Sequence, residues 1–77
     1  MNMLNDQATF MRACDQTVGE FNQTQYDMYV SLIDEEVKEL HDAINDQDRV
    51  EQLDALIDIM VVTIGALHSM GVYSHAA

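Results

Sequence analysis

The sequence of 77 residues contains no proline, and its only glycines are Gly19, Gly65 and Gly71. Proline and glycine are the residues that most often interrupt helices and form the turns of β proteins. Their scarcity leaves long segments in which apolar residues recur at spacings of three and four, which is the period of an amphipathic helix. The sequence therefore predicts an all-α fold.

The first of three expected helices is the shortest. It begins with Asn5 or Asp6 as its N-cap and ends at Gly19. Phe10 and Cys14 lie on its apolar face. We expect Cys14 to be a small core residue, because a single cysteine can form no disulfide within the chain.

The second and third expected helices form an antiparallel hairpin with a short link. The second covers about residues 24–45, and the third runs from Asp48, in a capping-box pattern with Glu51, to Met70. The second helix carries an apolar stripe of Tyr26, Tyr29, Val30, Ile33, Val37, Leu40 and Ile44. The middle of the third helix, residues 59–67, is apolar around its whole circumference and needs neighbours on several sides.

One short first helix cannot supply all of these neighbours. The expected fold is therefore a short antiparallel helical bundle of about three helices per chain. We expect homo-oligomerisation, as a homodimer or a homotetramer, to complete a four-helix-type core.

Charge and length exclude several classes of protein. The chain carries 3 Lys and Arg against 14 Asp and Glu, a net charge of −11, which repels phosphate backbones and anionic lipids. Neither nucleic acid nor a membrane is therefore an expected partner. A hydrophobic content of 48% is too high for a disordered tail, and the length allows a single domain, residues 1–77. The single cysteine and the absence of a secretory segment predict a cytoplasmic location.

Acidic residues occupy both halves of the expected hairpin. They are Glu35, Glu36 and Glu39 on the second helix and Glu51, Asp54 and Asp58 on the third. The three on the third helix fall within an arc of about 60°, and Asp58 adjoins the apolar run. A buried carboxylate must be hydrogen-bonded, paired, protonated or bound to a metal. Since few cations are available, a hard divalent ion with oxygen ligands is the economical choice. A hydrogen-bonded core acid at Asp58 and a solvated acid at Glu35 remain alternatives.

These acids form a pattern, an E-E-x-x-E helix followed by an E-x-x-D helix, at Glu35–Glu39 and Glu51–Asp54. The pattern resembles the signature of the all-α nucleoside triphosphate pyrophosphohydrolase superfamily, which includes MazG proteins, phosphoribosyl-ATP pyrophosphohydrolases and dimeric dUTPases. Residues 32–43 and 50–65 look most like the small, phage-type, phosphoribosyl-ATP pyrophosphohydrolase-like members.

The resemblance implies a metal-dependent hydrolase that uses Mg²⁺ or Mn²⁺. It would cleave a nucleoside triphosphate or related nucleotide between the α and β phosphates, giving a monophosphate and pyrophosphate. Carried over to this chain, the catalytic acids are Glu35, Glu36 and Glu39, with Glu35 as a ligand or as the base that orients water. The metal ligands are Glu36, Glu39, Glu51, Asp54 and Asp58, and the last two compete for the role of main aspartate ligand.

Candidate substrate contacts are Lys38, the cation nearest to the acids, and Asn22 and Gln23, which precede the second helix. A polar connecting loop would give the same pattern at Asn22 and Gln23. No Lys or Arg follows Arg49, whereas many relatives carry basic residues after the last acidic helix. Two further functions stay open, phosphoribosyl-ATP hydrolysis in histidine synthesis and a non-catalytic acidic helical interaction module. The sequence specifies neither the base nor the number of metal ions.

Overall fold

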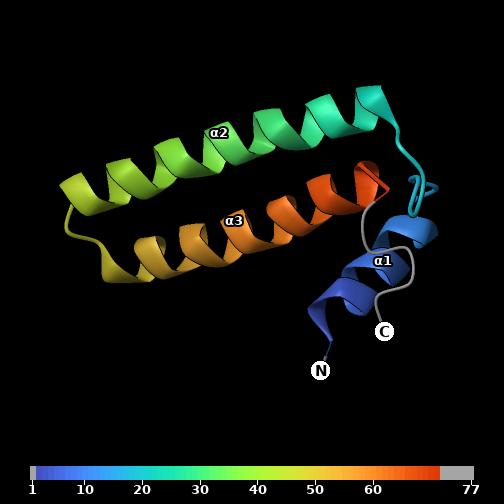
Figure 1. Cartoon of the computed structure of the whole chain (residues 1–77). Coiled ribbons are helices and arrows are strands. Elements are labelled where there is room, and N and C mark those ends of the chain that lie inside the picture. The colour runs from blue at the N-terminus through green and yellow to red at the C-terminus, as the bar shows by residue number, and fades with distance from the viewer. Residues whose placement is uncertain (1, 72–77) are drawn as a thin grey trace.

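The computed structural model describes residues 2–71, which form three helices. They are α1 (Met3–Ala13), α2 (Gln23–Asn45) and α3 (Arg49–Ser69). The helices α2 and α3 form an antiparallel hairpin, and α1 packs against α3 near its C-terminal end (Figure 1). The predicted all-α bundle of three helices is confirmed.

Each helix begins at a side-chain cap. Asn2, Asn22 and Asp48 each accept a hydrogen bond from the backbone N–H three residues later, over 3.1, 3.0 and 3.0 Å. Such caps satisfy a backbone donor that has no partner within the helix. The prediction of an N-cap at Asn5 or Asp6 was wrong, because Asn2 already supplies this bond one turn earlier.

The first two helices end in the same kind of turn. A residue in the left-handed conformation follows each of them, Asp15 with φ 59° and Gln47 with φ 56°. The backbone N–H groups of this left-handed residue and of the residue after it donate to carbonyls of the last helical turn, which is the Schellman arrangement. The predicted end of the first helix at Gly19 was therefore wrong: α1 ends at Ala13 because Asp15 adopts a conformation that glycine usually supplies.

The early end of α1 also changes which of its residues are buried. The helix packs through Ala8 and Met11, which are 5% and 0% exposed. Phe10 is 58% exposed, and Cys14, which follows the last turn, is exposed as well. The expectation that Cys14 is a core residue was wrong, since the apolar side of this short helix is only two turns long.

The link between α2 and α3 consists of residues 46–48. Asp48 caps α3 through its side chain, and its own backbone N–H donates to the Ala43 carbonyl at 2.9 Å. Because that N–H is already used, only half of the predicted capping box with Glu51 forms. A link this short holds the two long helices in one antiparallel register.

The core forms where the three helices meet. Met11, Tyr29 and Ala66 are its buried centre. The ring of Tyr29 lies directly over Gly65, where any Cβ would overlap the ring. The Tyr29 hydroxyl donates to Oε1 of Gln16 at 2.5 Å, which ties the segment after α1 to the hairpin. Gly65 thus allows α2 and α3 to approach closely at this point.

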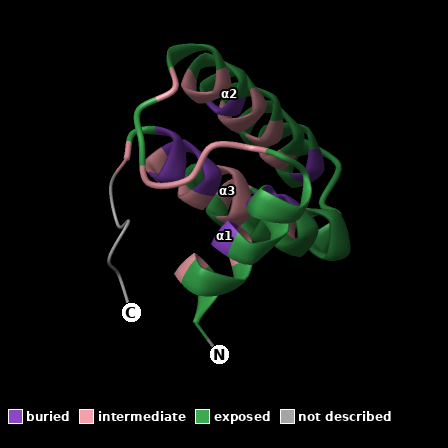
Figure 2. Cartoon of the chain, turned by 90° about the vertical axis from the view of Figure 1, so that its right-hand side faces the viewer, coloured by how far each residue is buried: buried purple, intermediate pink, exposed green. Residues whose placement is uncertain are grey.

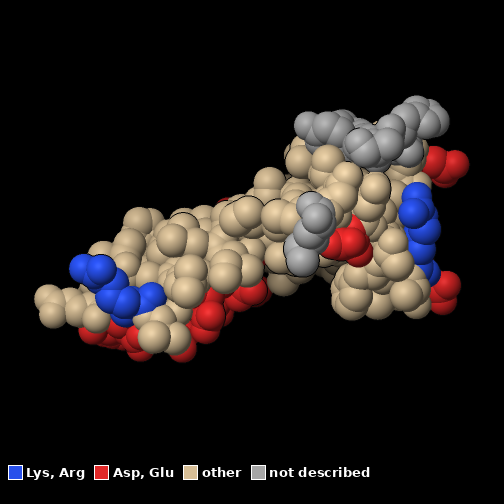
Figure 3. Space-filling model, turned by 90° about the horizontal axis from the view of Figure 1, so that it is seen from below, with Lys and Arg blue, Asp and Glu red and all other residues tan. Residues whose placement is uncertain are grey.

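Much of the apolar surface remains uncovered within one chain. In the predicted stripe of α2, Tyr29 is buried, whereas Val30, Val37 and Ile44 are 37%, 37% and 48% exposed. Figure 2 shows the buried residues on the facing sides of the helices and exposed residues over their outer sides. The side of the hairpin seen from below is a broad area of uncharged residues (Figure 3). Within residues 2–71, no helix has the length and hydrophobicity that crossing a membrane requires.

The contact between Gly65 and Tyr29 gives a first prediction. Replacing Gly65 with alanine favours the helix by about 1 kcal/mol but overpacks the core, which costs about 1–3 kcal/mol. We expect the overlap with the ring to dominate, so that Gly65→Ala lowers the free energy of unfolding by about 1–2 kcal/mol in urea titrations. Thr63→Ala, an exposed change on the same helix, is the control. A Gly65→Ala protein more stable than the parent would contradict this packing.

Candidate functional site

The predicted acids lie on one side of the hairpin. Figure 3 shows carboxylates gathered along one edge of the two long helices, beside the uncharged area. Glu35 and Glu39 share one face of α2, and Glu51, Asp54 and Asp58 share one face of α3, because they recur at spacings of three and four residues. The antiparallel hairpin therefore brings acids from both helices to the same face.

Glu36 of α2 has acidic neighbours on both helices, Glu39 on α2 and Asp58 on α3. Glu36 is partly buried, and its Oε2 atom is inaccessible to solvent and has no hydrogen-bond partner in residues 2–71. Burial raises the pKa of Glu36 above its ordinary value of 4.5, and the negative charges of Glu39 and Asp58 raise it further. Glu36 thus has one carboxylate oxygen that is shielded from solvent and two other carboxylates as neighbours.

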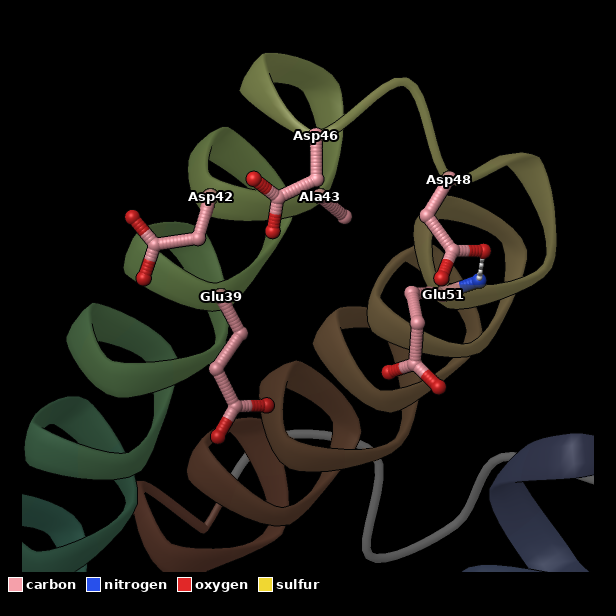
Figure 4. Close-up of a pocket in the computed structure, with 6 residues that line it drawn as sticks. All are labelled: Glu39, Asp42, Ala43, Asp46, Asp48 and Glu51. Atoms are coloured by element: carbon pink, nitrogen blue, oxygen red, sulfur yellow. Dashed lines mark hydrogen bonds between the residues drawn. The ribbon is translucent and has the colours of Figure 1, made fainter.

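Glu39 also borders an open hollow of about 290 Å³ near the link between the helices. Its lining residues are Glu39, Asp42, Ala43, Asp46, Asp48 and Glu51 (Figure 4). In the figure, Glu39 extends from α2 toward the space in front of Glu51 on α3, and the dashed line marks the Asp48 cap. The structure thus brings Glu39 and Glu51 to one hollow, as the motif predicts.

The sequence interpretation missed three acids of this hollow, Asp42, Asp46 and Asp48. The spacing from Glu39 to Asp42 to Asp46 is three and then four residues, so that a single face of α2 continues past the motif. That spacing could have identified them. Asp48 is engaged as the cap of α3.

Two of the predicted acids stand apart. Glu35 and Asp54 neither line the hollow nor contribute to the raised pKa of Glu36. Both are exposed, as is Asp58, so the expectation of a buried acid at Asp58 was wrong. Asp54 lies one turn from Asp58 on the same side of α3, between the hollow and Glu36. Among residues 2–71, no three Asp, Glu, His or Cys side chains are close enough together to form a ready-made cation site. Like charges at helical spacing repel one another, which favours this open arrangement.

The predicted substrate contacts lie in two different places. Lys38 is next to the acids and forms an exposed ion pair with Asp42 at 3.4 Å. Asn22 and Gln23 lie at the opposite end of α2, about 25 Å along the helix from Glu39 at 1.5 Å per residue. Within one chain they cannot contact a nucleotide whose phosphates lie at the acids.

Asn22 is moreover part of the fold. Besides capping α2, its amide group donates to Oγ1 of Thr17 at 2.9 Å. The neighbouring Gln25 donates to the Thr17 carbonyl and to Oγ of Ser69, both at 2.7 Å. These bonds fasten the segment before α2 to the end of α3, which fits the alternative that this segment is a connecting loop. Gln23 donates to Asp27 at 2.7 Å on the exposed side.

An all-α hairpin with acids of both helices on one face is the arrangement that a resemblance to the MazG-like nucleotide pyrophosphohydrolases implies. Residues 7–77 match the phosphoribosyl-ATP pyrophosphohydrolase family, and the chain belongs to this family. It is thereby a hydrolase that acts on acid anhydrides, and the alternative of a non-catalytic module is not supported. Members of the family typically depend on a divalent metal. No curated protein and no solved structure matches the chain significantly.

The partly buried carboxylate of Glu36 leads to a prediction about pH. Since its pKa is raised in the folded state, the fold binds this proton more tightly than the unfolded chain does. The folded state is therefore destabilised as the pH rises from below 4.5 through the raised pKa. With chelator at pH 7, we expect Glu36→Gln to melt at a higher temperature than the parent, by a small amount because solvent screens the charges around this partly exposed side chain.

The same comparison at a pH below the ordinary carboxyl range is the control. There the parent's Glu36 is protonated in both states, and the difference in Tm between the two proteins should disappear. A Glu36→Gln protein that is less stable than the parent at both pH values would mean that the carboxylate makes a stabilising contact in the fold.

Proposed function

We propose that this chain is a Mg²⁺-dependent nucleotide pyrophosphohydrolase that also accepts Mn²⁺. It cleaves a nucleoside triphosphate or a related nucleotide between the α and β phosphates. The observation that carries the proposal is the Oε2 atom of Glu36, buried without a hydrogen-bond partner and adjacent to Glu39 and Asp58. Carboxylate oxygens are the ligands that a hard divalent cation prefers, so these donors match such an ion in kind. The side chains would have to turn toward it, because no three of them in residues 2–71 are close enough together to hold it.

The proposed role of each acid depends on its position in the hairpin. Glu36, Glu39 and Asp58 supply the central oxygens, and Glu51 and Asp54 supply those of the neighbouring turns. This assignment uses both readings of the motif, since Asp58 adjoins Glu36 while Asp54 lies on the turn before it. A bound divalent cation would neutralise phosphate charge and lower the pKa of a water molecule.

Glu35 and Lys38 would complete the reaction site. Glu35 is exposed on the side of α2 that carries Glu39, where its carboxylate can accept a hydrogen bond from the attacking water and then its proton. The side chains of Lys38 and Asp42 are 80% and 60% exposed, and an ion pair this exposed is worth little. Lys38 is therefore free to turn toward a phosphate oxygen.

Family membership supports phosphoribosyl-ATP as a second candidate substrate. It carries the same α–β phosphoanhydride bond, so the same acids would serve. A panel that contains both phosphoribosyl-ATP and the common nucleoside triphosphates separates the two candidates.

Pyrophosphate release with Mg²⁺ and with chelator tests the activity. We expect release that requires the metal and that falls by about 100-fold or more in Glu39→Gln, because a ligand of the cation that would stabilise transition-state charge is lost. Asp34→Asn is the matched control, since Asp34 is an exposed acid of α2 outside the cluster and the hollow. Release that persists in chelator, or Glu39→Gln at parental activity in a folded protein, would contradict the proposal.

We further infer that the chain works as a homodimer or homotetramer. On α3, Val50, Leu53, Leu56, Ile57 and Met60 are between 47% and 69% exposed. Apolar residues in such number along one helix mark a surface that another chain covers. A second copy is the simplest partner, and it would supply the four-helix-type core.

Light scattering after gel filtration tests this inference. The parent should elute as a dimer or tetramer, and Leu53→Lys, at a position that is 58% exposed, should shift it toward the monomer. The exposed change Asp34→Asn should leave the mass unchanged. A parent protein that is monomeric at every concentration would refute the oligomer.

A further inference from the structure

A second hollow lies between α1 and α3, and none of the acids of the motif lines it. Its volume is about 350 Å³, and its lining residues are Met3, Asp6, Gln7, Phe10, Val61 and Ile64. Four of these are apolar, one is a carboxylate and one is an amide. Pockets for small organic molecules have this volume and this composition, with apolar walls and a few polar groups.

The hollow begins close to the acidic cluster. Val61 follows Asp58 by three residues and Ile64 by six, so they lie about 4.5 and 9 Å further along α3. Both side chains face the hollow where α1 approaches α3. In a nucleotide only a ribose separates the base from the α phosphate. A nucleotide with its phosphates at Asp58 can therefore place its base in this hollow.

The walls suit a flat aromatic ring. Phe10 and Met3 line the hollow from α1. They are 58% and 37% exposed, so their side chains are accessible to a ligand. Stacking of a base on an aromatic side chain is favourable for every base, because every base has a π face. Burial of these side chains against a ring would remove apolar area from water.

The polar groups discriminate among bases. The carboxylate of Asp6 only accepts hydrogen bonds, whereas the amide of Gln7 both donates and accepts. A base with an exocyclic amino group can donate to Asp6. In a base that carries an oxo group at the same position, a carbonyl oxygen would face the carboxylate and be repelled.

We propose that the hollow between α1 and α3 binds the base of the nucleotide substrate, stacked against Phe10, and that Asp6 selects bases that carry an exocyclic amino group. The inference rests on the proposed function, because it assigns the base of the same substrate. It places base recognition on residues of α1 and not on Asn22 and Gln23, the candidate substrate contacts at the far end of α2.

Matched substrate pairs test the selection. ATP and ITP, and likewise CTP and UTP, differ chiefly by an amino group that is replaced by an oxo group. We expect the parent to favour the amino member of each pair by about tenfold or more in kcat/KM, since a lost hydrogen bond and a repulsive contact act together. Asp6→Asn, which can donate as well as accept, should reduce this ratio toward one. Asp15→Asn, at an exposed acid outside the hollow, should keep it.

A binding measurement separates this inference from the proposed activity. With α,β-methylene-ATP, which resists hydrolysis, the NMR methyl signals of Val61 and Ile64 should shift. Phe10→Ala should weaken the binding by about fivefold or more, as expected for lost base stacking. Phe21→Ala is the control, because Phe21 is also 58% exposed and does not line the hollow.

Each outcome decides the inference. Methyl shifts at Val61 and Ile64 in a protein that hydrolyses nothing would support the base pocket and contradict the activity. Hydrolysis without these shifts and without a preference for amino bases would overturn the base pocket alone. Signals that respond to protein concentration and not to the nucleotide would assign the hollow to a second copy of the chain, and would overturn it too.

Discussion

The close approach of α2 and α3 at Tyr29 and Gly65 determines the geometry of the rest of the protein. Because Gly65 has no side chain, the ring of Tyr29 fits against α3, and this fixes the register of the hairpin. Glu36 follows Tyr29 by seven residues on α2, and Asp58 precedes Gly65 by seven residues on α3. Seven residues is two helical turns, so the contact that packs the core also brings these two carboxylates together.

The elements that repeat with helical period were predictable from the sequence. The expected second helix, residues 24–45, agrees with Gln23–Asn45, and Asp48 was identified as the cap of the third. The end of the first helix was not predictable from glycine positions, since Asp15 takes the left-handed conformation instead. Likewise, the sequence gives the angles of the acids around each helix but not the register between the helices, which decides that Asp58 and not Asp54 adjoins Glu36.

Two features of this hairpin that the proposed function uses lower the stability of a single folded chain. Burial and two neighbouring charges raise the pKa of Glu36, so ionisation of this carboxyl group destabilises the folded chain. The outer side of α3 remains apolar and exposed, which is a second cost for a single chain in water. The two partners that we propose, a divalent cation for the carboxylates and a second chain for the apolar side, would offset both costs.

Cation binding at the cluster around Glu36 is the central claim, and Mn²⁺ titration followed by electron paramagnetic resonance tests it most directly. Bound Mn²⁺ loses the sharp signal of the free ion, so the binding is measured without any substrate. We expect the parent to bind Mn²⁺ saturably. The binding should weaken by about tenfold or more in Glu36→Gln and in Asp58→Asn, and should be unchanged in Asp34→Asn. Equal binding by all four proteins would show that the ion is held elsewhere on the acidic surface, and would contradict a cation site at Glu36.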